Sequence, residues 1–161
     1  MTQPVKIQPL TAAAFAPFGD IIARTATPSF TINDGQCDRY HDLARLEFTG
    51  GGRANISLAR SRPAELPLRL TMVERHPLGS QAFIPVDGNP FLIVVAPDKN
   101  GTPGMPLAFM SNGAQGINYL RNTWHGILTP IGAEQTFVII DRAGEGDNLQ
   151  EHHFDAAFLV G

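Results

Sequence analysis

Eight short segments rich in β-branched and aromatic residues constrain the fold of this chain more than any other feature. Glycine, proline and asparagine separate these segments, and the 16 glycines and 13 prolines of the chain supply the turns between them. Many short strands at such spacing are typical of a β-sandwich or a β-barrel. The expected strands are residues 55–59, 68–73, 81–84, 91–96, 107–110, 116–119, 124–128 and 137–141.

Residues 91–96, Phe-Leu-Ile-Val-Val-Ala, are apolar at every position. A strand with one face in water alternates apolar and polar residues, so this strand is expected to be covered on both faces. The cover comes either from the rest of the molecule or from a partner subunit. Helical signals are sparse, and Thr11 can cap only one short turn at residues 12–15. The chain is therefore predicted to be a single all-β domain over residues 1–161, a barrel with one or two short helices.

The length and charge of the chain argue against several classes of protein. With 161 residues it can form one domain with a core of its own but not two. Its formal charge of -3, with no basic stripe, argues against a nucleic-acid partner. Its longest apolar run is far shorter than the roughly 20 residues that span a bilayer, and Cys37 has no partner for an intramolecular disulfide. We therefore expect a cytoplasmic protein without nucleic-acid or membrane partners.

Four polar residues in two separate stretches are candidates for one site. Glu74 and His76 are two residues apart, so on a pleated strand their side chains lie on the same face. Gln81 begins the next expected strand, and His125 lies on a later one. If these strands are neighbours, groups suited to metal binding or to acid–base chemistry converge inside one barrel. The sequence therefore predicts a functional site around them.

The spacing of these residues resembles that of the two motifs of cupin barrels, which are double-stranded β-helices of the jelly-roll type. Glu74, His76, Gln81 and Gly88 stand in the places of the first motif, and residues 120–125 in those of the second. Glu74 replaces a histidine of the usual first motif, and Gln81 replaces its glutamate. The resemblance implies a cupin-like β-barrel that allows a loosely held divalent metal without requiring one.

Six longer stretches of the sequence are more specific than this spacing. They are Phe-x-x-Phe-Gly-Asp-Ile-Ile at 15–22, Asn-Asp-Gly at 33–35, Arg-Tyr-His-Asp-Leu at 39–43, His-Pro-Leu-Gly-Ser-Gln-Ala-Phe-Ile-Pro at 76–85, Asn-Tyr-x-Arg-Asn-x-Trp-His at 118–125 and Ile-Asp-Arg at 140–142. These stretches resemble one cupin family, the ureidoglycolate lyases, formerly called ureidoglycolate hydrolases. The resemblance covers nearly the whole chain in the expected order. The chain departs from the family at Leu120 and Gly126, where members tend to carry histidines.

The resemblance implies cleavage of (S)-ureidoglycolate to glyoxylate and urea, a late step in the degradation of allantoin and other purine products. A base would remove the hydroxyl proton of the substrate, a carbonyl would form, and urea would leave as an acid protonates its nitrogen. The catalytic candidates are His76, His125 and Gln81, with either histidine as the base. Glu74, His76 and His125 are the candidate metal ligands, since nickel is associated with some members of the family. The family also implies a homodimer.

The remaining candidates would bind the substrate. Ser80, with the glutamine that follows it, would hold the ureido group. Tyr119 and Arg121, expected on one face of a strand, would hold the carboxylate, because a hydroxyl and a guanidinium suit an anion. Phe83 and Trp124 are expected to form walls of the pocket.

Structural roles compete with these assignments. His76 could merely cap a strand end, Glu74 could lie on the surface if Arg75 points inward, and Arg121 could pair with Asp141 on the rim of the barrel. Two other functions also fit a cupin barrel, namely a non-catalytic protein that binds a small acid and a different metal-dependent enzyme such as a dioxygenase or sugar isomerase. The glutamate in place of the first-motif histidine argues against the second of these.

Overall fold

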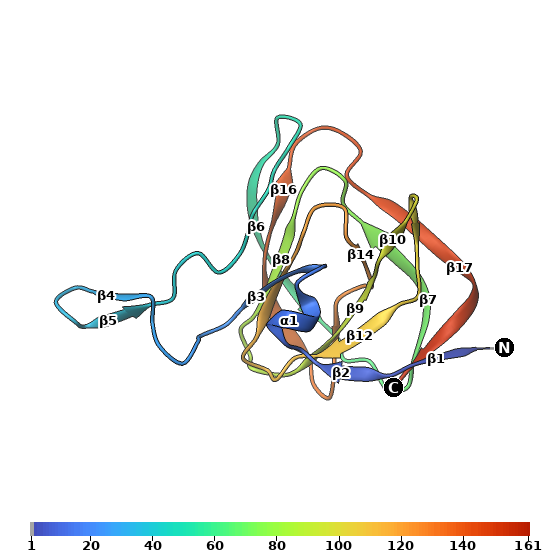
Figure 1. Ribbon diagram of the computed structural model, residues 1–161, viewed down its shortest axis with the longest axis horizontal. Helices are drawn as coiled ribbons and strands as arrows, with labels where there is room; N and C mark the ends of the chain where they lie inside the picture. The colour runs from blue at the N-terminus through green and yellow to red at the C-terminus, as the bar shows by residue number, and fades with distance from the viewer. Residues whose placement is uncertain (1) are drawn as a thin grey trace.

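Two β-sheets packed face to face form the body of the protein in the computed structural model, which describes residues 2–161 (Figure 1). The larger sheet has the strand order β1-β17-β7-β14-β9-β12-β2, with β15 also paired to β9, and the smaller sheet has the order β3-β13-β8-β16-β6. The elements are β1 (Gln3–Val5), β2 (Ile7–Pro9), α1 (Ala12–Phe15), β3 (Gly19–Ile22), β4 (Phe30–Ile32), β5 (Cys37–Arg39), β6 (Arg53–Ser61), β7 (Leu68–Arg75), β8 (Gln81–Pro85), β9 (Phe91–Ala96), β10 (Asp98–Lys99), β11 (Thr102–Pro103), β12 (Leu107–Met110), β13 (Gly116–Tyr119), β14 (Trp124–His125), β15 (Thr129–Pro130), β16 (Gln135–Ala143) and β17 (Gln150–Val160).

The larger sheet curls into a nearly closed barrel because its two end strands are consecutive in the chain. Only Lys6 separates β1 from β2, yet β1 pairs in parallel with β17 at one end of the sheet and β2 with β12 at the other. Figure 1 shows β1 and β2 running one after the other along the lower edge of the molecule. The curled sheet encloses an apolar core of its own, made of Val5, Leu70, Val73, Leu92, Val94, Ala96, Ala108, Trp124 and Val160.

A second core fills the space between the two sheets. It is rich in aromatic rings that meet edge to face, such as Phe91 with Phe137, whose ring centroids are 5.0 Å apart. The core consists of Leu10, Phe15, Phe18, Phe83, Phe91, Ile93, Val95, Phe109, Ile117, Tyr119 and Phe137. The structure thus confirms the expected all-β barrel, and the site described below lies at one end of this second core.

Strand β9 belongs to both cores, and every one of its residues is buried. Phe91, Ile93 and Val95 face the core between the sheets, whereas Leu92 and Val94 face the core inside the curled sheet. The prediction that this strand is covered on both faces is therefore confirmed. The cover comes from the molecule itself, with no need of a partner subunit.

Most of the expected strands are present, and three of them, β9, β12 and β13, have the expected bounds. The expected strand at 124–128 ends early, at His125, and the chain then passes through a loop to β15. The longest strand, β17, was not expected, because its polar residues resemble a surface tail. It pairs along β7 and closes the larger sheet, with a register shift between His153 and Phe158 that lets it follow the curve.

The single helix in residues 2–161 forms where the sequence predicts it, with the Thr11 hydroxyl accepting a hydrogen bond from the Ala14 amide at 3.3 Å. It has four residues, so no helix in this part of the chain is long and apolar enough to cross a membrane. The hairpin β4–β5 projects away from the barrel as an arm (Figure 1). His41 lies at the base of this arm against Phe30, away from the interior of the barrel.

Candidate active site

The space between the two sheets holds two facing pairs of polar residues, one on each sheet. On the larger sheet, Glu74 of β7 pairs directly with His125 of β14. On the smaller sheet, Gln81 of β8 pairs directly with Tyr119 of β13. The Tyr119 ring stacks on the His125 imidazole with centroids 4.2 Å apart and planes within 7° of parallel. This stack joins the two pairs across the interior, so the predicted convergence of these strands is present.

His76, just beyond the end of β7, completes a cluster with Glu74 and His125. One possible ligand atom from each of the three residues lies within 4.8 Å of the other two. His76 Nε2 is 3.8 Å from Glu74 Oε1, and the two imidazole centroids are 5.2 Å apart. Glu74 therefore faces inward, as the two-residue spacing from His76 predicts. Arg75 lies on the opposite face, with its guanidinium over the ring of Trp124.

Hydrogen bonds at the Nδ1 atoms fix the tautomer of both histidines. His76 Nδ1 is 2.7 Å from the carbonyl oxygen of Asn148, and His125 Nδ1 is 3.0 Å from that of Gly126. Since a carbonyl oxygen only accepts, each Nδ1 carries a hydrogen, and in the neutral imidazole Nε2 then presents a lone pair. Both Nε2 atoms and Gln81 Oε1 are buried without a hydrogen-bond partner. Buried groups left unpaired in this way indicate a place for a ligand, because an unsatisfied polar atom in the interior is costly.

Burial shifts the pKa values of His125, Glu74 and Tyr119. It lowers the pKa of His125 to about 3, with a smaller effect in the same direction from His76, so this imidazole is neutral near pH 7. Burial raises the pKa of the Glu74 carboxyl, which the neighbouring His76 partly offsets. Burial also raises the pKa of Tyr119, so its hydroxyl keeps its proton. The cluster thus offers the neutral imidazole of His125 beside a carboxyl whose affinity for protons is increased.

A cavity of about 260 Å³ opens beside these groups. Its polar end carries Glu74, Gln81, Tyr119 and His125, and none of its lining residues within 2–161 is a lysine or an arginine. The rest of the lining is apolar apart from the glycine, namely Ala59, Phe83, Phe91, Leu92, Gly126, Ile127, Leu128 and Ile139. A wider and more open depression of about 650 Å³ shares only Ile127 and Leu128 with the cavity and holds none of the polar groups above.

Three residues expected to bind substrate do not line this cavity. The Ser80 hydroxyl accepts a hydrogen bond from the Glu47 amide at 2.8 Å, because Ser80 and Gln81 are adjacent and point in opposite directions. Trp124 likewise points away from His125, into the core of the curled sheet, where its Nε1 donates to Asp98 at 2.9 Å. Phe83 does line the cavity, as expected.

Arg121 is the third of these residues. Strand β13 ends at Tyr119, and a turn follows in which Asn122 has a φ of 67°. Tyr119 and Arg121 therefore do not share a strand face. The Arg121 guanidinium lies outside the barrel, with its Nε 3.0 Å from Glu47. The alternative pairing of Arg121 with Asp141 is absent as well, since Arg121 pairs with Glu47 and Asp141 accepts a hydrogen bond from Asn55.

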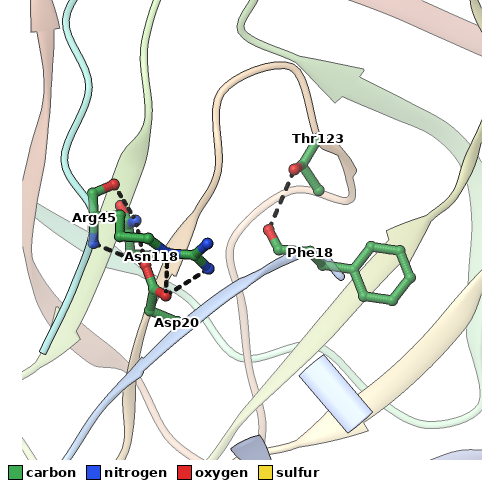
Figure 2. A network of polar contacts seen from close by, with 5 residues as sticks. All are labelled: Phe18, Asp20, Arg45, Asn118 and Thr123. Carbon is green, nitrogen blue, oxygen red and sulfur yellow. Dashed lines mark hydrogen bonds and ion pairs between the residues drawn. The ribbon is translucent and has the colours of Figure 1, made fainter. Parts of the chain in front are cut away.

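A polar network on the outer side of β13 holds the Tyr119 strand in place (Figure 2). The buried Asn118 amide donates to Asp20 at 3.1 Å and to the Arg45 carbonyl at 3.0 Å. Arg45 in turn binds Asp20 through its backbone amide and its guanidinium, both at 2.9 Å. Although burial opposes it, these hydrogen bonds keep the pKa of Asp20 below its usual value. Figure 2 also shows Thr123 donating to the Phe18 carbonyl, at 3.2 Å, which fixes the turn before His125.

Sequence reasoning missed the residues that position the cluster. Asn148 holds His76 through its backbone carbonyl and the Leu78 amide through its side chain, at 2.7 Å each. A backbone carbonyl leaves no signal in the sequence. Asn118 lies in one of the stretches that predicted the site, but only the fold shows which partners its side chain meets.

These observations define the class of the protein. A barrel of facing sheets whose interior brings together two histidines, a carboxylate and a glutamine is a cupin-like barrel. The chain belongs to the ureidoglycolate lyase family, since the family model described as ureidoglycolate lyase matches residues 2–161.

Curated relatives agree with this assignment over nearly their whole length. A ureidoglycolate lyase of Chelativorans sp. (strain BNC1) is 57% identical over 95% of this chain and 93% of its own. Ureidoglycolate lyase 2 of Rhizobium meliloti (strain 1021) is 55% identical over 98% of this chain and 97% of its own. A ureidoglycolate lyase of Rhodobacter capsulatus is 54% identical over 96% of each chain.

The low pKa of His125 predicts how stability depends on pH. The imidazole stays neutral down to about pH 3 in the folded protein, whereas its ordinary pKa is 6.5. Between these values the unfolded chain binds a proton that the folded chain does not. This residue therefore makes the free energy of unfolding rise with pH, by up to about 1.4 kcal/mol per pH unit, the slope for one proton. The His125→Gln variant lacks this group. Its free energy of unfolding in urea should therefore vary less between about pH 4.5 and 6.5 than that of the wild type. An equal pH dependence of the free energy of unfolding in the wild type and the variant would contradict the low pKa of His125.

Proposed function

We propose that the protein is a ureidoglycolate lyase, which cleaves ureidoglycolate to glyoxylate and urea. The observation that carries the proposal is the convergence of the unpaired Nε2 atoms of His76 and His125 with the Glu74 carboxylate. Glu74 and His125 line a cavity sized for a small molecule, and His76 lies beside them. The names of the relatives support the same reaction.

The chemistry needs only the movement of one proton. In ureidoglycolate one carbon bears a hydroxyl, a carboxylate, a hydrogen and the ureido nitrogen. As the hydroxyl loses its proton, its oxygen forms a double bond to that carbon and the carbon–nitrogen bond breaks. The departing nitrogen takes up a proton, which gives urea and leaves glyoxylate. Water is not consumed, so one group that accepts and then returns a proton is sufficient.

His76 is the residue best placed to carry this proton. Its Nδ1 hydrogen is held by the Asn148 carbonyl, which directs the Nε2 lone pair into the site. An imidazolium formed there would lie 3.8 Å from the Glu74 carboxylate, which would stabilise it. His125 is less suited to this task because burial lowers its pKa to about 3. Its lone pair and the Gln81 amide would orient the substrate instead.

The same atoms fit a divalent metal such as nickel. Two imidazole Nε2 atoms, a carboxylate and an amide oxygen make a reasonable ligand set, and three of these groups have buried atoms without partners. The substrate is an anion, yet no cationic side chain within residues 2–161 lines the cavity. When bound, a divalent cation would neutralise the substrate carboxylate and lower the pKa of a hydroxyl in contact with it. Because one lone pair cannot bind a metal and accept a proton at once, this second proposal is tested separately from the first.

We also propose that the protein forms a homodimer through the outer face of the smaller sheet. Ile56 and Leu58 on edge strand β6 are each 71% exposed. The strand register places them beside Ile140 and Val138 of β16 on the same face. An exposed row of aliphatic side chains on a sheet is typical of a surface that another protein covers. A second copy of this chain would bring an equivalent row to the contact.

Substitution of His76 tests the lyase activity and the proton carrier together. The wild type should release glyoxylate and urea from racemic ureidoglycolate faster than the spontaneous reaction, with half of the racemate consumed by the enzyme. His76→Ala should lower kcat/KM by about 10²–10⁴-fold, the usual contribution of one acid–base group. The measurement is glyoxylate release, followed with a coupled reductase after the spontaneous rate is subtracted.

The matched control for this experiment is His153→Ala, which removes an imidazole that is 72% exposed on β17. Its kcat/KM should equal that of the wild type. If His76→Ala kept wild-type turnover, the assignment of the proton carrier would fail. If the wild type gave no rate above background, the lyase proposal itself would fail.

Calorimetry with Ni²⁺ tests the metal proposal without reference to activity. Protein treated with a chelator and then dialysed should bind one Ni²⁺ per chain. The double variant His76→Ala/His125→Ala should lose this binding, because it removes both imidazole ligands, whereas His153→Ala should retain it. Equal binding by the double variant and the wild type would exclude this cluster as the metal site.

Sedimentation equilibrium tests the dimer. Introducing charge with Ile56→Glu/Leu58→Glu should convert a dimer into a monomer, because it places two carboxylates in an apolar contact. Met105→Glu, at a residue 47% exposed on another part of the surface, serves as the control and should remain dimeric. A monomeric wild type, or a dimeric double variant, would overturn the proposal.

A further inference from the structure

The inner face of the smaller sheet carries polar residues beyond Gln81 that the proposed mechanism does not use. Strand pairing places Tyr119 opposite Gln81, and Asp141 opposite Asn55. The ladder between β8 and β16 ends with Ala82 opposite Ile140, so its continuation places Gln81 beside Asp141. Directly opposed residues have Cβ atoms about 5 Å apart. Tyr119, Gln81, Asp141 and Asn55 therefore form one row across four strands.

Side chains alternate between the two faces of a strand, and this alternation directs Asp141 and Asn55 toward the space between the sheets. On β16, Phe137 is in the core between the sheets and Ile139 lines the cavity, and Asp141 follows at the same spacing of two residues. On β6, Ala59 lines the cavity, and Asn55 lies four residues before it on the same face. Arg142 takes the opposite direction and binds backbone carbonyls outside the barrel.

Asp141 is held in place but keeps hydrogen-bonding capacity. The Asn55 amide donates to Asp141 Oδ1 at 3.1 Å and to Ser57 Oγ at 3.2 Å. These are the side-chain hydrogen bonds of the pair within residues 2–161, so Asp141 Oδ2 and the side-chain carbonyl oxygen of Asn55, Oδ1, accept none from the protein. Both groups can therefore accept hydrogen bonds from a ligand, next to the unpaired Oε1 of Gln81.

A ureido group is the complementary partner for such acceptors. Its two nitrogens present parallel N–H bonds on the edge away from the carbonyl, and a carboxylate accepts such a pair in the same forked way that it accepts a guanidinium. Asp141 lies one strand spacing away from Gln81, and this separation also fits the length of the substrate. With the reacting carbon at Glu74, His76 and His125, the ureido end would reach the neighbouring strands.

We propose that Asp141, positioned by Asn55, binds the ureido group of the substrate and thereby selects ureido acids over simple 2-hydroxy and 2-oxo acids. This inference rests on the proposed lyase function, since it assigns the ureido end of ureidoglycolate to Asp141 and Asn55. A ligand without the ureido group leaves these acceptors unpaired, and a site built for hydrogen bonding discriminates strongly against such a ligand.

Binding of N-carbamoylglycine, which is the substrate without its hydroxyl and cannot be cleaved, tests the inference independently of turnover. Calorimetry should show that Asp141→Asn weakens its binding by at least about tenfold, because the amide presents a donor to the ureido N–H groups. Glyoxylate, which has no ureido group, should bind the wild type and the variant equally. Asp155→Asn, an exposed change on β17, is the matched control and should leave both affinities unchanged.

The outcomes separate this inference from the lyase proposal. Unchanged binding of N-carbamoylglycine by Asp141→Asn would overturn the subsite, even if the wild type is an active lyase. Equal weakening of N-carbamoylglycine and glyoxylate would also overturn it, since that pattern indicates general damage to the cavity. Selective weakening would support the subsite even if ureidoglycolate itself were not cleaved, in which case the lyase proposal alone would fail.

Discussion

The burial of β9 on both faces is the constraint on which the rest of the molecule depends. A strand with six apolar residues needs two covers, and each large side chain that is buried contributes about 1.5–3 kcal/mol. The smaller sheet supplies one cover. The larger sheet supplies the other by curling until β1 and β2, consecutive in the chain, pair with its opposite ends. Two cores in a chain of 161 residues are possible because they share this strand.

The position of His125 follows from the same arrangement. Strand β14 has only two residues, held between β9 and β7, and His125 pairs with Val95 on one side and with Glu74 on the other. Alternation sends Trp124 into the core of the curled sheet and His125 into the space between the sheets. The imidazole is 2% exposed and meets the Tyr119 ring face to face. Packing of β9 thus fixes both the burial of this histidine and its low pKa.

The sequence was sufficient to predict the barrel, the doubly covered strand and the pairing of Glu74 with His76, since these depend on spacing along a strand. It was insufficient where the chain leaves a strand. Arg121 was misplaced because β13 ends at Tyr119, and no residue type announces the turn geometry at Asn122. Strand β17 was missed because apolar residues are sparse in its first half, although several lie near its C-terminal end. Its pairing with β7 joins residues about 75 to 92 positions apart along the chain, from Gln150 with Arg75 to Val160 with Leu68, which periodicity does not reveal.

Arg142 has a consequence for how the rim of the cavity behaves when a ligand arrives. Its guanidinium binds the carbonyls of Thr49, Gly50 and Glu145 at 2.8, 3.2 and 2.7 Å, and so ties the loop before β6 to the end of β16. Asp141, the adjacent residue, and its partner on β6 are therefore ordered when the chain folds. Because little conformational entropy is left to lose at this edge, a ligand would meet a preorganised surface, and its affinity would depend on complementarity of shape and hydrogen bonds.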